Sequence, residues 1–250
     1  MKINLCLVGN YIEKHINFNE FKNLVEHYKN TLKNYDFNIY IVIWDTISLE
    51  LKEKIEKMGK LFMFKMPELK KILNSNTWSV SNNDKVLKQI NDNKGEIWGA
   101  NIYNIYSMFN LRKKAMDIVY NDNPNSYTFL IRVDMSMSFN NIKNWISKNT
   151  YNVNYYRCWR EKCKTHKLFN TQHRPVSDQT SIGETSLIYN FYNMTDSELS
   201  NLFKISRNGE TSVFNRLKQL KLTCIQQRQP DAHNMLLISN CNKYIMRINE

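Results

Sequence analysis

The two charged residues with the clearest chemical potential are Arg132 and Asp134, which follow the apolar run Phe129-Leu130-Ile131. That run is typical of a buried β-strand. Residues i and i+2 of a strand share a face, so the two opposite charges point the same way where the strand ends. The carboxylate could hold a divalent metal that bridges the phosphates of a nucleotide diphosphate, and the guanidinium could pair with phosphate oxygens. A structural ion pair that caps the sheet edge explains the spacing equally well.

Further polar residues follow two other predicted strands. Gly9 and Asn10 come directly after the β-rich run Ile3–Val8, and Asp45 follows the run Asn38–Trp44, which is apolar on both faces. In mostly parallel sheets, ligands bind at the carboxyl ends of the strands. We therefore expect these three residues to line one site together with the charged pair.

Arg112 is a fourth candidate, on a predicted helix. It lies in register with the apolar stripe of Phe109, Met116 and Val119, where a charge is awkward. If this helix packs beside the site, Arg112 or Lys113 could reach a phosphate. A side-chain stem lying along the margin of the stripe is the alternative.

These candidates depend on an alternation of strands and helices over the first half of the chain. Helices are expected at Phe18–Lys33, Ser48–Met58 and about Glu96–Tyr120, and a further strand at Leu61–Lys65. The order predicts an α/β fold with a mostly parallel, doubly wound central sheet flanked by helices.

The second half has a weaker pattern. A strand within Asn154–Trp159, a helix at Glu210–Leu220 and a closing strand at Leu222–Ile225 are expected. No internal repeat or linker-like tract interrupts the 250 residues, which predicts a single domain, 1–250.

The overall charge leaves several kinds of partner open. The net charge is +12, but the lysines are scattered and form no dense run. Such a surface suits nucleic acid, nucleotide diphosphates or a peripheral contact with an anionic membrane.

The cysteines and the N-terminus indicate a reducing compartment. The five cysteines are odd in number and lack paired spacing, which is typical of reduced thiols. The apolar run at the N-terminus is too short for a signal peptide or a membrane span. A cytoplasmic protein is therefore expected.

A zinc site is a rival interpretation of one polar segment. Cys158, Cys163, His166 and His173 could close a tetrahedral site, although structural zinc motifs usually have tighter cysteine pairs. The basic residues around them fit a segment that flanks an acceptor or a diphosphate, or ordinary solvated surface.

Several short motifs, taken in order, resemble a known family. They are the run from Asp36 through Ile41-Val42-Ile43-Trp44 to Asp45, the run Tyr127–Asp134, the run Asp178–Gly183 and Glu210. The series is similar to the GT-A type glycosyltransferases that build surface polysaccharides, including the lipopolysaccharide-synthesis group called WavE-like. Arg132 occupies the first acidic position of the family's D-x-D metal motif, which puts two-carboxylate metal binding in doubt.

The resemblance implies a GT-A-like single domain with a Rossmann-type sheet, in which about 1–140 bind the nucleotide sugar and about 141–250 face the acceptor. Gly9 and Asn10 would line the donor pocket, and Asp45 would contact the base or ribose. Arg132 would touch the sugar or the diphosphate, and Asp134 would hold Mn²⁺ or Mg²⁺.

Two late residues also receive roles from the resemblance. Asp178 would be the general base if the reaction inverts the anomeric centre, because it lies where the acceptor should approach. A helix N-cap is its alternative role. His233 would supply a further metal ligand, and a structural histidine is the alternative.

The function that the resemblance implies is transfer of a sugar from a UDP- or GDP-sugar donor to a hydroxyl of a glycan acceptor, with no nucleic-acid partner. Two alternatives stay open. One is a basic nucleic-acid-binding protein without catalysis, and the other is a degenerate transferase that only binds sugar nucleotides.

Overall fold

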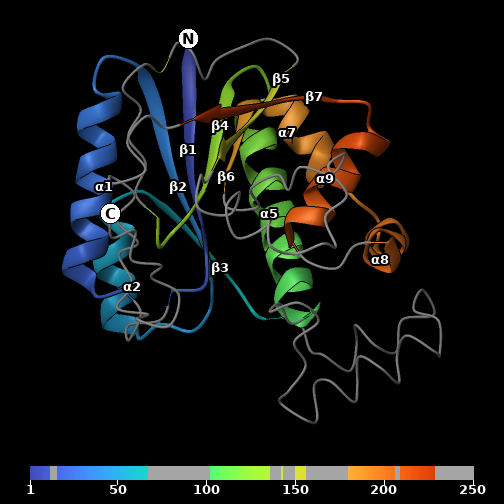
Figure 1. Cartoon of the computed structure of the whole chain (residues 1–250). Helices are drawn as coiled ribbons and strands as arrows, with labels where there is room; N and C mark the ends of the chain where they lie inside the picture. Colours follow the sequence, from blue (N-terminus) through green and yellow to red (C-terminus); the bar gives the residue numbers. More distant parts are fainter. Residues whose placement is uncertain are drawn as a thin grey trace, which may run out of the picture.

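A seven-stranded sheet forms the centre of the protein in the computed structural model, which describes residues 1–11, 16–66, 102–135, 142, 150–155, 180–205 and 209–228 (Figure 1). The strands are, in chain order, β1 (Lys2–Gly9), β2 (Asp36–Trp44), β3 (Lys60–Phe64), β4 (Tyr127–Arg132), β5 (Thr150–Tyr155), β6 (Thr180–Glu184) and β7 (Thr223–Arg228). Their spatial order is β3-β2-β1-β4-β6-β5-β7. Strands β3, β2, β1 and β4 are parallel, β6 is antiparallel to both of its neighbours, and β5 and β7 pair in parallel. The predicted α/β fold with a mostly parallel sheet is confirmed.

Helices cover both faces of this sheet (Figure 1). Those within the described residues are α1 (Phe18–Leu32), α2 (Leu49–Glu56), α5 (Ile102–Asp122), α7 (Thr185–Tyr192), α8 (Asp196–Ile205) and α9 (Gly209–Gln219). Helices α1 and α2 pack on one face, and α5, α7, α8 and α9 contribute to the core on the other. None of the described helices combines the length and the apolar composition that a membrane span requires.

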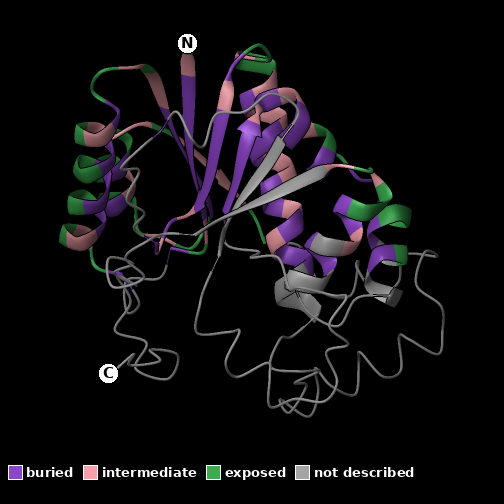
Figure 2. Cartoon of the chain, turned by 45° about the horizontal axis from the view of Figure 1, so that its top comes forward, coloured by how far each residue is buried: buried purple, intermediate pink, exposed green. Residues whose placement is uncertain are grey.

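Strand β1 shows how the sequence alternation builds two cores. Ile3, Leu5 and Leu7 belong to the core beneath α1 and α2, whereas Cys6 and Val8 belong to the core beneath α5 and α7. Successive side chains of a strand point to opposite faces, so a strand covered on both sides is apolar over most of its length. The buried Asn4 is an exception in β1, and its Nδ2 donates to Ser126 Oγ at 2.6 Å. Figure 2 shows the buried strands between helices whose outer faces are exposed.

Two helices begin with reciprocal hydrogen bonds between a capping residue and a glutamate three positions later. At α1 the Glu20 amide donates to Asn17 Oδ1 (2.9 Å) and the Asn17 amide donates to Glu20 Oε2 (3.0 Å). At α8 the Thr195 amide donates to Glu198 Oε2 (2.8 Å) and the Glu198 amide donates to Thr195 Oγ1 (3.2 Å). Both pairs satisfy amides that a helix N-terminus would otherwise leave without partners.

Most predicted elements are confirmed, with shifted ends. β5 begins at Thr150 rather than Asn154, and α5 is described from Ile102, while 67–101 lie outside the described residues. Strand β6 and helix α8 were not predicted. Asp178, with its N-cap alternative, lies outside the described residues; β6 begins at Thr180 and α7 at Thr185.

Candidate functional site

The Arg132 and Asp134 side chains form a two-pronged ion pair just past the end of β4. Arg132 Nε donates to Asp134 Oδ1 at 2.8 Å, and Arg132 Nη2 donates to Asp134 Oδ2. The side chains are 40% and 21% exposed, respectively. Both carboxylate oxygens therefore accept hydrogen bonds from one guanidinium, at a place that solvent can reach.

The loop after β1 leaves the sheet directly beside this pair. The Val133 amide donates to the Val8 carbonyl oxygen at 3.1 Å, so the contact between β1 and β4 continues past the end of β4. Gly9 has φ +156°, and a Cβ added there would lie 3.5 Å from Val133 Cγ2. The backbone of Gly9 thus lies against the turn that carries Asp134.

Thr46 connects the ends of β1 and β2. Its Oγ1 donates to the carbonyl oxygen of Tyr11 at 3.1 Å and lies 3.4 Å from Asn10 Oδ1. Its neighbour Asp45 is exposed, and the Asp45 amide donates to the Phe64 carbonyl oxygen at 2.8 Å. Sequence reasoning missed Thr46, and the only available signal was a hydroxyl residue directly after the acid that ends a buried strand.

The register of the strands places these residues on one edge. Val8 pairs with Arg132, and Gly9 pairs with Ile43, in neighbouring parallel strands. The carboxyl ends of β2, β1 and β4 therefore carry Asp45, Gly9 with Asn10, and Arg132 with Asp134, respectively. Gathering at the carboxyl edge of a parallel sheet is the arrangement by which such sheets bind ligands.

Arg112 lies in the core rather than on the exposed edge. Its side chain is buried, at 2% exposure, with Nη1 donating to the Tyr192 hydroxyl at 3.0 Å. The Tyr192 hydroxyl lies 2.7 Å from Ser181 Oγ. Among the described residues, Arg112 Nη2 has no hydrogen-bond partner. The whole side chain is covered, so it does not lie along an exposed margin of the helix stripe, and a role in donor binding stays a prediction.

The positive charge of Arg112 acts on a neighbouring thiol. Burial raises the pKa of Cys6 far above its usual value, and the nearby Arg112 charge opposes that rise. Cys6 is a free cysteine inside the core. Its thiol therefore stays protonated and behaves as a small apolar group.

The remaining predicted residues lie outside the described part of the chain. These are Asp178, His233 and the four potential zinc ligands Cys158, Cys163, His166 and His173. Within the residues that the structure describes, no three histidine, cysteine or acidic side chains gather as a metal site would require.

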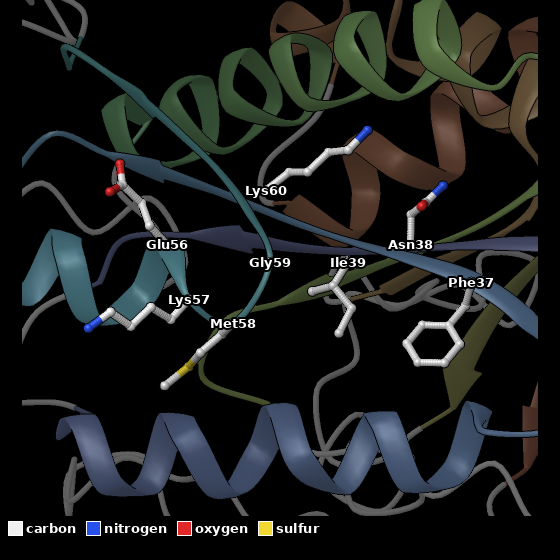
Figure 3. A pocket seen from close by; sticks show the side chains of 8 residues that line it. All are labelled: Phe37, Asn38, Ile39, Glu56, Lys57, Met58, Gly59 and Lys60. Atoms are coloured by element: carbon white, nitrogen blue, oxygen red, sulfur yellow. The ribbon is translucent and has the colours of Figure 1, made fainter.

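A cavity of about 580 Å³ lies at the opposite, amino-terminal edge of β2 and β3 (Figure 3). It is lined by residues at the start of β2 and in the turn between α2 and β3: Phe37, Asn38, Ile39, Glu56, Lys57, Met58, Gly59 and Lys60. Figure 3 shows Phe37, Ile39 and Met58 pointing toward α1, and Lys60 pointing the other way. None of the candidate site residues predicted from the sequence lines this cavity.

No family model matches the chain, and no curated protein matches it. A solved structure of a provisionally named nucleotide-diphospho-sugar transferase from Desulfovibrio desulfuricans G20 is similar over 90% of this chain and 79% of its own, with 8% identity and a TM-score of 0.45. A likeness this distant carries no argument about activity, so the site depends on its own geometry.

Proposed function

We propose that this protein is a glycosyltransferase that moves a sugar from a UDP- or GDP-sugar to a hydroxyl of a glycan acceptor. The observation that supports this most is the Arg132–Asp134 pair at the carboxyl edge of β4, beside the Gly9 loop of β1. A cation and a carboxylate at one strand end match what a sugar nucleotide and its metal require. The family resemblance of the motifs around β2 and β4 supports the same activity.

The chemistry of the edge suits a diphosphate. A guanidinium presents its donors in a planar fork that fits phosphate oxygens, and Arg132 is accessible enough to use it. Gly9 has no side chain, so the loop after β1 lies close to Val133 in the turn that carries Asp134. Asn10 and Asp45 are exposed at the same edge, where they would contact the base or ribose.

The donor set at this edge accommodates a metal with one change. Mg²⁺ and Mn²⁺ sites for phosphoryl ligands commonly use one or two carboxylates, and the phosphates and waters complete the shell. Asp134 would supply the carboxylate, provided that Arg132 releases an oxygen. A bound Mn²⁺ or Mg²⁺ would neutralise charge on the leaving diphosphate. The resemblance adds His233 as a further ligand and Asp178 as the general base.

The test is a thermal-shift panel of nucleoside diphosphates and nucleotide sugars, with and without Mn²⁺ or Mg²⁺. A ligand that binds only the folded state, present at about 100 times its Kd, stabilises by about 2.7 kcal/mol, which is about 5–10 °C for a chain of this size. We expect a metal-dependent shift with one nucleotide family that is lost in Asp134→Ala. Asp122→Ala is the matched control, because Asp122 also forms an ion pair but lies at the far edge.

Three outcomes separate the alternatives. If no nucleotide shifts the melting temperature in any metal condition, the transferase proposal is wrong. Binding to nucleic acid that weakens steeply with salt and tolerates Asp134→Asn would then favour the basic nucleic-acid-binding protein. Nucleotide-sugar binding without turnover would indicate the degenerate transferase.

A further inference from the structure

We infer that Asp134 exchanges partners during donor binding: it holds Arg132 in the free protein, and it releases Arg132 to the diphosphate when it accepts a divalent cation. This inference rests on the proposed function, and it assigns Arg132 a second position that the free protein does not show. It replaces a preformed metal site with one in which a cation alone must compete with Arg132 and therefore binds weakly, and which the diphosphate strengthens by accepting Arg132.

The first step is the occupancy of the carboxylate. Both oxygens of Asp134 accept from Arg132, one through Nε and one through Nη2. A divalent cation on either oxygen would lie beside a guanidinium, and like charges at contact distance repel strongly. The cation and Arg132 therefore compete for Asp134.

The second step is the ease of release. Arg132 is 40% exposed, and ion pairs between accessible side chains contribute little stability. Arg216 provides a contrast, because its side chain is 7% exposed and donates to the carbonyl oxygens of Phe191 and Asn190 as well as to Glu198. The Arg216 donors are shielded from water, whereas solvent reaches the Arg132 guanidinium and can hydrate it when it turns away from Asp134.

The third step is the destination of the guanidinium. Asp134 lies in the turn two residues beyond Arg132, beside Gly9, so a diphosphate that reaches the cation on Asp134 also comes within reach of Arg132. Phosphate oxygens then replace the carboxylate as acceptors in the same fork geometry. The pair thus keeps its charge balance, since each member gains a partner of opposite sign.

The exchange makes a thermodynamic prediction. Because the cation frees Arg132 for the diphosphate, each ligand must raise the affinity for the other by the same factor. Removing Arg132 frees Asp134 in advance. A variant without Arg132 should therefore bind the cation more tightly than the wild type when no nucleotide is present. Adding the nucleotide should then raise its cation affinity by a smaller factor than in the wild type.

The experiment measures Mn²⁺ binding by titration calorimetry and electron paramagnetic resonance, without nucleotide, in the wild type and in Arg132→Gln. We expect Mn²⁺ affinity to rise about two- to fivefold in Arg132→Gln, which matches the loss of a competing accessible ion pair. Lys60→Gln is the control, since it removes the same charge from the Lys60–Asp122 pair at the far edge, and its Mn²⁺ affinity should equal that of the wild type. Arg132→Lys keeps the charge but lacks the forked guanidinium that donates to both Asp134 oxygens. We therefore expect its Mn²⁺ affinity to lie between those of the wild type and Arg132→Gln.

UDP and GDP affinities, with and without Mn²⁺, complete the test. Mn²⁺ should raise the affinity of the preferred nucleotide about tenfold in the wild type and about threefold or less in Arg132→Gln. The proposed exchange is wrong if the Mn²⁺ affinity stays unchanged or falls in both Arg132 variants. It is also wrong if Mn²⁺ raises the nucleotide affinity by the same factor in Arg132→Gln as in the wild type. Circular dichroism confirms folding, and Arg132→Lys carries the test if Arg132→Gln does not fold. Nucleotide binding that needs no Mn²⁺ would end the exchange and leave the transferase proposal standing.

Discussion

The Val133 amide donates to the Val8 carbonyl oxygen at 3.1 Å, which fixes the turn carrying Asp134 against the loop that leaves β1. The Arg132–Asp134 pair and Gly9 are therefore not independent features of two strands. A change in the backbone at Gly9 should therefore displace the Arg132–Asp134 pair. The pair should keep its position only while β1 and β4 stay in register.

Gly9→Ala tests this coupling. The added Cβ would meet Val133 at an ordinary contact distance of 3.5 Å, so crowding is not the main cost. The cost comes from the backbone angle φ of +156°, which residues other than glycine rarely adopt. We therefore expect a destabilisation of about 1–3 kcal/mol. Urea unfolding measures it. An unchanged midpoint would show that the loop relaxes freely and that Gly9 does not constrain the site.

Gly59→Ala should destabilise for a different reason. A Cβ at Gly59 would lie 2.8 Å from Ile39 Cγ2 and 2.9 Å from the Ile39 carbonyl oxygen. The carbonyl oxygen belongs to the backbone, so a change of side-chain rotamer cannot relieve that second contact. The expected loss is about 1–3 kcal/mol. Ile39→Ala removes the Cγ2 contact but is itself destabilising because Ile39 is buried, so the test is whether Gly59→Ala costs less in the Ile39→Ala background than in the wild type. Additive effects in a double-mutant cycle would contradict a direct contact.

The central strands and the carboxyl-edge residues could be predicted because their signals are local. β2 is apolar on both faces, since Ile41 and Ile43 pack under α1 and α2 while Val42 and Trp44 pack under α5. This pattern predicts a strand covered on both sides, and its end at Asp45 follows directly. The i, i+2 spacing likewise predicted that Arg132 and Asp134 share a face, which the bidentate pair confirms.

Strand β6 could not be predicted from local pattern, because its polar residues are satisfied by distant partners. Ser181 is buried and meets the Tyr192 hydroxyl, and Thr180 is buried opposite Ile131 in β4. By contrast, helix α8 had a usable signal in Thr195 and Glu198, whose spacing is typical of a capping box. The helix pattern placed Arg112 in the apolar stripe, but it could not identify the partner from α7, the Tyr192 hydroxyl, that accepts from the buried guanidinium.

Arg112→Met and Tyr192→Phe should have opposite effects on stability. The described residues include no carboxylate paired with Arg112, so a methionine of similar length should be neutral or stabilising. Tyr192→Phe instead removes the acceptor of a buried guanidinium hydrogen bond and should cost about 1–3 kcal/mol. Unfolding by urea compares them. Nucleotide affinity lost in a stable Arg112→Met protein would support the predicted donor-binding role.

Tyr40, Lys60 and Asp122 form a cluster at the start of β3, and its protonation affects the free energy of unfolding at high pH. The Tyr40 hydroxyl donates to Asp122 Oδ2 at 3.1 Å, and Lys60 Nζ donates to the same oxygen at 2.8 Å. Burial, followed by the hydrogen bond to Asp122, raises the pKa of Tyr40 above its usual value of about 10. The hydrogen bond to Asp122 also raises the pKa of Lys60.

Tyr40→Phe should flatten the loss of stability in alkali. A raised pKa in the folded state means that the unfolded chain loses its proton first, so the folded protein binds more protons between the two values. The stability that Tyr40 contributes is thus complete below about pH 10 and declines as the pH rises through its folded pKa. The free energy of unfolding, measured by urea titration from pH 8 to 11, should fall more steeply in the wild type than in Tyr40→Phe. Lys60→Gln should also flatten the curve, because the folded pKa of Lys60 is raised in the same direction. Parallel curves for wild type and Tyr40→Phe would show that burial and Asp122 do not raise the folded pKa of Tyr40.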